Sequence, residues 1–217
     1  MKIKAFKGLR PVKDKAADIA SLPYDVVNFE QAAEQAKGKP LSFMRVVRSE
    51  IELPEGIEPY SQAVYDHAKE NFEKLVKNGH MVREDAPCMY LYRQVMGGHA
   101  QTGLVATFSA EDYDNDVIKK HEKTREAKEN DRYMLTRTLR VNTGPVFLTV
   151  KDGTELDKIV ENTKDSDALF DFTADDGIRH TVWKISDPST LEKIVKIFDA
   201  IPCAYVADGH HRSASNA

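Results

Sequence analysis

Near the end of this 217-residue chain lies the sequence Ala204-Tyr205-Val206-Ala207-Asp208-Gly209-His210-His211-Arg212. Its apolar first half predicts a short strand, the pair Asp208-Gly209 predicts a tight turn, and the polar residues that follow predict the first turn of a helix. Such a turn can bind an anion, because the first N–H groups of a helix have no partner within it and the helix dipole is positive there. The stretch therefore predicts a phosphate-binding loop.

The side chains of this loop suit the same chemistry. Gly209 allows a positive φ or the close approach of a ligand. Asp208 adds a carboxylate for magnesium binding or proton transfer, and Arg212 adds a fixed cation. The competing interpretation is that Asp-Gly is an ordinary turn pair and that residues 210–212 are a solvated loop. The sequence alone leaves both interpretations open.

The composition is that of a soluble globular protein, with 41% hydrophobic and 30% charged residues. The net charge of -4 argues against a nucleic-acid or anionic-membrane partner, because such partners normally need a strongly basic face. No window approaches the about 20 apolar residues of a membrane span, and residues 1–10 are too polar for a signal peptide. Cys88 and Cys203 lie in apolar runs and are too few for a disulfide framework. We therefore expect a cytoplasmic protein with reduced thiols.

Apolar periodicity predicts helices and strands along the whole chain. The predicted helices span 29–36, 59–78, 117–140, 154–163 with Thr154 as its cap, and 188–198; the predicted strands span 3–6, 42–48, 88–96, 100–109, 146–150, 168–173 and 178–186. The glycine turn at 97–99 favours a hairpin between two of these strands. Because hairpins and helices intermix, we predict an α+β fold, with a mixed, largely antiparallel sheet and flanking helices.

We expect residues 1–217 to form a single α+β domain, because the sequence contains no internal repeat, low-complexity tract or clear linker. The helix that should support the terminal loop has barely begun where the sequence stops. We therefore expect the domain to be truncated at its C-terminus.

The predicted helix 117–140 contains a cationic stripe. Helical spacing puts four residues on one of its faces: His121, Arg125, Lys128 and Arg132. The default interpretation is a solvated helix whose cations pair with neighbouring glutamates. The alternative is that the stripe lines a cleft for a polyanion.

The first fifty residues contain further candidates. In the predicted strand 42–48, alternation places Arg45 and Arg48 on opposite faces, and arginine suits bidentate binding of phosphate. Asp25 lies between an aromatic and an aliphatic residue, so burial could raise its pKa and make it a base. The alternative, which the local sequence favours, is a turn carboxylate that caps a backbone N–H.

Several of these motifs follow one another in an order that resembles a known family. The motifs are Pro23-Tyr24-Asp25-Val26, Arg45 with Arg48, His121-Glu122-Lys123-Thr124, Lys128 with Asp131-Arg132, and the stretches 142–147, 180–187 and 207–212. They resemble a bacterial and archaeal family catalogued as domain of unknown function 1015, over nearly the whole chain. The resemblance implies no established activity, and members of that family are typically longer than this chain.

The terminal loop also resembles the phosphate-binding loop of the ParB and sulfiredoxin superfamily, which includes nucleotide hydrolases, sulfiredoxins and kinases that act on free serine. This resemblance covers only the loop and implies a ParB/sulfiredoxin-like fold around it. It implies that His210, His211 and Arg212 contact nucleotide phosphates and that Gly209 permits close approach of the backbone to the nucleotide. It also implies ATP or ADP with Mg²⁺ as cofactor, and a catalytic set in which Asp208 orients the metal or substrate, His210 takes part, and Asp25 is the base, although no shared motif aligns Asp25.

The leading hypothesis is a phosphate- or nucleotide-binding enzyme, such as a small-molecule kinase of the serine type. Phosphoryl transfer needs charge neutralisation and in-line positioning more than a protein nucleophile. The chain has no GxxxxGK[ST] loop and no kinase glycine loop, so a nucleotide site must be of another kind. Five further residues are expected to bind the nucleotide: Arg45, Arg48, His121, Lys128 and Arg132. The expected partner is a phosphorylated small molecule or a nucleotide, and a homo-oligomer is compatible with the sequence.

Two other functions stay open. The first is a metal-dependent hydrolase that uses Asp208, His210, His211 and His121, although adjacent histidines point in different directions from most backbones. The second is a non-enzymatic ParB-like regulator that binds nucleotide or DNA as a switch, although the acidic net charge counts against DNA.

Overall fold

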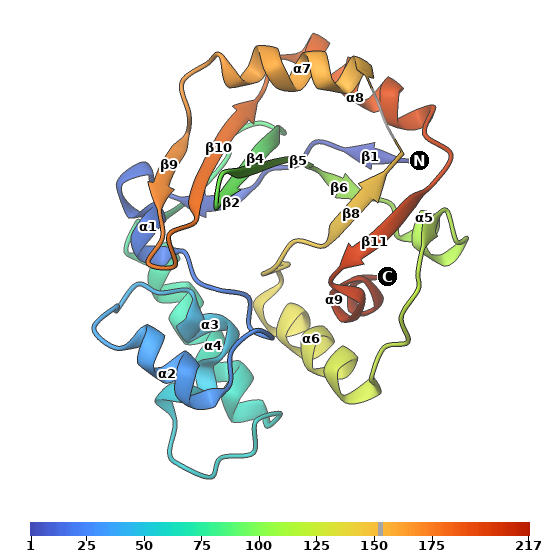
Figure 1. Ribbon diagram of the computed structural model, residues 1–217. Coiled ribbons are helices and arrows are strands. Elements are labelled where there is room, and N and C mark those ends of the chain that lie inside the picture. Colours follow the sequence, from blue (N-terminus) through green and yellow to red (C-terminus); the bar gives the residue numbers. More distant parts are fainter. Residues whose placement is uncertain (152–153) are drawn as a thin grey trace.

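The computed structural model describes residues 1–151 and 154–217 (Figure 1). The first half of the chain forms β1 (Ile3–Lys4), β2 (Leu9–Pro11), the 3-10 helix η1 (Lys13–Lys15), α1 (Ala16–Ile19), α2 (Phe29–Ala36), α3 (Met44–Val47), the 3-10 helix η2 (Ser49–Glu52), α4 (Gln62–Lys77), β3 (Met81–Arg83), β4 (Met89–Met96) and β5 (His99–Val105). The second half forms β6 (Thr107–Phe108), α5 (Ala110–Asp114), β7 (Ile118–Lys119), α6 (Glu126–Leu139), β8 (Phe147–Val150), α7 (Thr154–Lys164), β9 (Phe170–Thr173), β10 (Arg179–Ile185), α8 (Pro188–Asp199), β11 (Ala204–Asp208) and α9 (His210–Asn216). The predicted α+β class is confirmed.

The strands form several small sheets, and most of their pairs are antiparallel. The largest sheet has the order β5-β4-β10-β9, and all its pairs are antiparallel. A second sheet has the order β7-β11-β8, in which β11 runs parallel to β7 and antiparallel to β8. The pairs β1–β6 and β2–β3 are also antiparallel. The predicted hairpin is β4–β5, with both Gly97 and Gly98 at positive φ in its turn.

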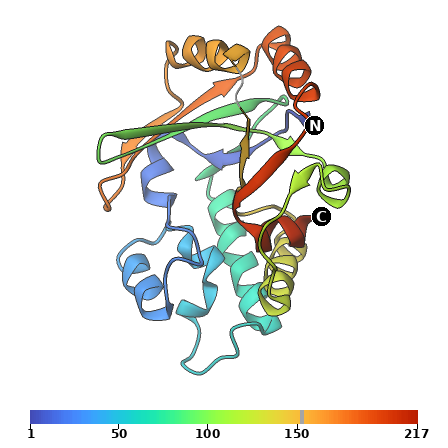
Figure 2. The same cartoon turned by 45° about the vertical axis from the view of Figure 1, so that its right-hand side comes forward.

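The sheets lie between two groups of helices. Figures 1 and 2 show α7 and α8 above the sheets, and α1 to α4 together with α6 below them. The main core lies between the sheets and α8, and its buried members are Met1, Ile3, Met89, Leu91, Ile118, Trp183, Ile185, Ile194, Phe198, Ala204 and Val206. A second core joins α4 to α6 and contains Ile19, Val46, Tyr65, Ala68, Phe72, Leu75, Leu135 and Leu139. The main core therefore fixes β11, the strand that leads into the terminal loop.

The starts of α2 and α8 follow their local capping signals. The side chain of Asn28 accepts a hydrogen bond from the Gln31 N–H, and the Gln31 side chain accepts one from the Asn28 N–H, which together make a capping box at the start of α2. Asp187 caps α8 through the Thr190 N–H, and Pro188 occupies the first turn. The side chain of Thr154, the expected cap of α7, lies outside the described residues.

The prediction of a strand over 42–48 is wrong. This segment is the short helix α3, in which both Met44 and Val46 are buried. Arg45 donates to the carbonyl oxygens of Ala36 and Lys39 and pairs with Glu52, so it binds the end of α2. A short apolar run of this kind is compatible with both helical and strand periodicity. Packing against α2 and α4 decides that it forms a helix.

The prediction of one helix over 117–140 is wrong in its first part. Ile118 and Lys119 pair in parallel with Ala204 and Tyr205, so this part of the chain is a strand. The helix α6 begins only at Glu126, after an irregular segment. Helical spacing suggested a continuous stripe, but the long-range pairing with β11 overrides it. Within the part of the chain that the structure describes, no helix has the length and apolar character needed to cross a membrane.

The surroundings of Glu84 predict that the stability of the protein decreases at acidic pH. Its buried carboxylate accepts hydrogen bonds from Arg10 and Lys184, at 2.5 Å each. Burial by itself raises the pKa of Glu84, but the hydrogen bonds from Lys184 and Arg10 outweigh burial, so the net pKa lies below its usual value. A lowered pKa contributes stability that is present above the unfolded pKa of about 4.3 and is lost as pH falls through the folded pKa.

We therefore expect Glu84→Gln to lower the free energy of unfolding by about 1–3 kcal/mol at pH 7, and this deficit to shrink below about pH 4. Urea unfolding between pH 3 and pH 7 measures the difference, with the exposed Glu161→Gln as control. A deficit that stays constant over this range would show that Glu84 does not titrate with a lowered pKa.

Candidate functional site

The terminal loop has the predicted strand–turn–helix form. Ala204 and Val206 of β11 are fully buried, whereas Asp208 at the end of the strand is exposed. Gly209 has φ 89° and ψ 36°, a left-handed conformation that favours glycine, and the first hydrogen bond of α9 runs from the Ser213 N–H to the Gly209 carbonyl oxygen. The loop therefore leaves the sheet through one glycine and enters a helix directly.

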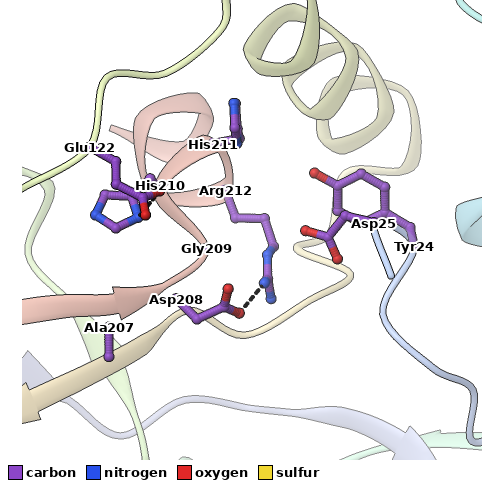
Figure 3. A pocket seen from close by; sticks show the side chains of 9 residues that line it. All are labelled: Tyr24, Asp25, Glu122, Ala207, Asp208, Gly209, His210, His211 and Arg212. Carbon is purple, nitrogen blue, oxygen red and sulfur yellow. Dashed lines mark hydrogen bonds and ion pairs between the residues drawn. The ribbon is translucent and has the colours of Figure 1, made fainter. Parts of the chain in front are cut away.

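A cavity of about 190 Å³ lies over this loop. Its lining residues are Tyr24, Asp25, Glu122, Ala207, Asp208, Gly209, His210, His211 and Arg212 (Figure 3). Figure 3 shows the Asp25 carboxylate pointing toward Arg212 from one side, with Glu122 beside His210 on the other side of the loop. Three segments far apart in the sequence thus meet in one place.

Arg212 holds the loop in shape. One guanidinium nitrogen donates to Asp208 Oδ2 at 2.6 Å, and another donates to the carbonyl oxygen of Pro145. The Nε atom of Arg212 is buried without a hydrogen-bond partner among the described residues. A Cβ atom on Gly209 would lie 3.2 Å from Arg212 Cζ. The arginine therefore lies directly against the glycine, and any side chain at position 209 would require Arg212 to shift.

The two histidines of the loop have different partners. His211 Nε2 accepts a hydrogen bond from the Arg125 N–H at 3.1 Å, so this imidazole carries its proton on Nδ1 while the bond is present. His210 is buried, and its Nδ1 lies 3.2 Å from Glu122 Oε2. Both histidines thereby attach the segment between β7 and α6 to the start of α9.

Asp25 is an exposed member of the site, and Tyr24 is a buried one. The Val26 N–H donates to the carbonyl oxygen of Pro23, so a backbone bond closes this turn without help from the Asp25 carboxylate. Burial raises the pKa of Tyr24, and the cation of Arg132 acts in the opposite direction. The Arg132 guanidinium carbon lies 3.8 Å from the centre of the Tyr24 ring. The turn is thus packed on a buried cation and keeps Asp25 at the cavity.

The structure brings some of the expected site residues together and separates others. Asp25 and the whole stretch 208–212 line the cavity. Arg132 lies behind Tyr24, paired with Asp131 at 2.6 Å, and does not line the cavity. His121 is next to the cavity, with its ring 4.5 Å from the ring of His210.

Three expected cations lie elsewhere. Arg45 binds the end of α2, and Arg48 donates to the carbonyl oxygens of Tyr24 and Val27 and pairs with Glu50. Lys128 is exposed, 5.8 Å from the centre of the Tyr60 ring. Arg48 therefore supports the Asp25 turn from behind, and Arg45 and Lys128 do not line the cavity.

Two lining residues, Tyr24 and Glu122, receive no role of their own from the sequence. Both belong to motifs that carry the family resemblance, but Tyr24 is there a neighbour of Asp25, and Glu122 is a potential ion-pair partner on a predicted helix face. The feature that connects Glu122 to the loop is its position three residues after Lys119, which pairs with β11. This pairing is not visible as a local pattern.

Comparison with protein families identifies one family, described as protein of unknown function (DUF1015), over residues 3–217. Comparison with curated proteins finds no match, and comparison with solved structures also finds none. These comparisons give no support for the likeness of the terminal loop to the ParB and sulfiredoxin superfamily. The family match extends over almost all of the sequence and includes every residue of the cavity. The chain belongs to the DUF1015 family of proteins of unknown function.

Proposed function

We propose that the cavity binds the phosphate group of a small molecule, and that the protein transfers a phosphoryl group between a nucleotide and a small acceptor. The observation that carries this proposal is the convergence of Asp25 with residues 208–212 around one cavity. A carboxylate, a guanidinium and the start of a helix there face the same space (Figure 3). These are the groups that phosphoryl transfer needs for charge neutralisation and for accepting a proton.

The binding half of the proposal rests on Gly209 and Arg212. Because Gly209 has no Cβ, the Arg212 guanidinium lies directly against its backbone, and the first N–H groups of α9 have no acceptor within the helix. The Arg212 Nε–H lies buried next to this backbone and has no hydrogen-bond partner among the described residues. A phosphate oxygen can accept hydrogen bonds from both kinds of donor, and the arginine cation offsets its charge.

The size of the cavity favours a small acceptor. Pockets for whole drug-sized ligands span about 300–1,000 Å³, and this cavity measures about 190 Å³. It therefore has room for a phosphoryl group and an acceptor of a few heavy atoms. The base and sugar of a nucleotide would extend beyond it.

Two carboxylates have roles in the proposed phosphoryl transfer. Asp25 accepts the proton of the acceptor hydroxyl as its oxygen attacks phosphorus, and the bond from phosphorus to the nucleotide oxygen breaks. Asp208 is the candidate ligand for the Mg²⁺ of ATP or ADP, because its side chain is 66% exposed. Its Oδ2 atom is bound to Arg212, so magnesium would bind the other oxygen or replace this ion pair.

Isothermal titration with inorganic phosphate, phosphoserine, ATP, ADP and CTP, each with Mg²⁺, tests the binding half. We expect saturable binding of at least one of these compounds, at one site per chain. If none of them binds, the phosphate site does not exist and the proposed function fails.

Gly209→Ala should weaken binding of the compound identified in this way by at least about tenfold. The new Cβ displaces Arg212 from its place against the loop, and the positive φ adds about 1–2 kcal/mol of strain. Gly177→Ala is the matched control, because Gly177 also has positive φ, lies in the β9–β10 turn and has nothing within 4 Å of the added Cβ. Equal affinities for the two variants would mean that the ligand does not contact the Gly209 backbone.

A further inference from the structure

A second group of potential ligands lies at the edge of the cavity. It consists of His121 and Glu122, from the segment between β7 and α6, and of His210, the first residue of α9. One ligand atom from each residue can be chosen so that all three lie within 4.8 Å of one another. Glu122 Oε2 is 3.2 Å from His210 Nδ1, and Glu122 Oε1 is 3.8 Å from His121 Nε2. The carboxylate thus lies between two imidazoles.

These separations are close to those of ligands around one metal ion. Zinc bonds of about 2.0–2.1 Å in a tetrahedral arrangement place two ligand atoms about 3.3 Å apart. The pair formed by Glu122 and His210 has this spacing already. The side chains of His121 and Glu122 are 61% and 62% exposed, so they can move closer without disturbing the core.

His210 is the fixed member of the group. It is only 5% exposed, and its Nε2 atom is buried without a hydrogen-bond partner among the described residues. Buried polar atoms normally have partners, and one without a partner is expected mainly at a functional site or next to an unseen ion or water. The Nδ1 atom of His210 faces Glu122 and is the atom available to a metal ion, and Nε2 would then carry the proton.

We propose that His121, Glu122 and His210 bind a divalent transition-metal ion of the zinc type. Two imidazoles and one carboxylate favour Zn²⁺ over Mg²⁺, which prefers oxygen ligands and retains several waters. Three protein ligands leave a fourth position for water or for an oxygen of a bound molecule. Glu122 and His210 also line the cavity, so this fourth position lies close to the proposed phosphate site.

The ligand set differs from the one that the sequence suggested for a metal. Asp208 is paired with Arg212, and His211 accepts the Arg125 N–H, so both have other partners. Glu122 takes their place in the set. The ion would also bind the segment after β7 to α9, next to the hydrogen bond that His211 makes. This inference does not rest on the proposed phosphoryl transfer, because the three ligands need no phosphate.

Titration of the whole chain with ZnCl₂, after treatment with a chelator and in phosphate-free buffer, tests the site. We expect one Zn²⁺ per chain, and we expect Co²⁺ in its place to give the strong visible absorption of a tetrahedral complex. His121→Ala should weaken Zn²⁺ binding by at least about tenfold, because it removes one of three ligands. His121 is exposed, so circular dichroism should show an unchanged fold.

His99→Ala is the matched control, because His99 is an exposed histidine at the start of β5. Its affinity for Zn²⁺ should equal that of the unchanged protein. Absence of stoichiometric binding, or equal losses in the two variants, would overturn the proposal. A negative result here leaves the phosphate titrations unaffected, since those contain Mg²⁺ and no zinc.

Discussion

Replacing Asp131 with alanine should lower the free energy of unfolding by about 3–5 kcal/mol, the usual cost of removing one partner from a buried ion pair. Asp131 and Arg132 are 6% and 8% exposed. The carboxylate accepts two hydrogen bonds from Arg132, at 2.6 and 3.0 Å, and one from the Tyr65 hydroxyl at 3.1 Å. Its loss leaves a buried guanidinium without an anion and a buried hydroxyl without an acceptor.

Urea unfolding measures this effect, and two variants test its cause. Asp131→Asn keeps the shape and one acceptor oxygen, so it should cost less than the alanine variant. The double variant Asp131→Leu with Arg132→Met removes both charges and should recover much of the lost stability. The exposed Asp165→Ala is the surface control. A loss below about 1 kcal/mol in Asp131→Ala would mean that water replaces the carboxylate.

Asp131 also influences the cavity at a distance. It holds Arg132, Arg132 lies against the Tyr24 ring, and Tyr24 is next to Asp25. Asp131→Ala should therefore weaken ligand binding in the cavity even where the protein stays folded.

If the protein transfers a phosphoryl group as proposed, replacing Asp25 with asparagine should lower the rate of this transfer by about 10²–10⁴-fold, the usual contribution of a general base. Asparagine has the same shape but cannot accept the proton of the acceptor hydroxyl. Asp25 is exposed and its turn is closed by a backbone bond, so the fold should not change. Binding of the phosphate ligand should change by less than about threefold, because the proposed donors to the phosphate are Arg212 and the first N–H groups of α9, and Asp25 is not one of them.

Single-turnover measurement with the compound found by titration separates these effects. Glu55→Gln, an exposed acid between η2 and α4, is the control and should retain the full rate. A full rate in Asp25→Asn would show that another group, or water, accepts the proton. Loss of binding instead of rate would assign Asp25 to ligand binding.

The sequence predicts those parts of the fold that depend on local signals. The capping residues Asn28 and Asp187 begin α2 and α8 as expected, and the glycine turn at 97–98 joins β4 to β5. The terminal strand–turn–helix is also local, because Gly209 alone permits the left-handed turn. For the same reason, residues 208–212, which are contiguous in the sequence, all line one cavity.

The remaining parts depend on contacts between distant segments. Residues 117–125 follow a helical pattern, but β11 draws residues 118–119 into a sheet. Arg45 and Arg48 looked like free cations, and only the folded chain brings backbone carbonyl oxygens to them. The approach of Glu122 to His210 has the same origin, since it depends on the parallel pairing of β7 with β11. A single sequence gives no local sign of such a pairing.

The parallel pairing of β7 with β11 also affects the order in which the protein can assemble. The cavity needs the turn at 23–27, the segment 120–125 and the loop 208–212 in place together, and these come from the beginning, middle and end of the chain. Contacts of such long range form slowly, because the entropy of closing long loops opposes them. A molecule that occupies the cavity binds only the fully assembled chain, so it shifts the folding equilibrium toward that state. Binding of such a molecule would therefore report that all three segments are in place, without any probe attached to the protein.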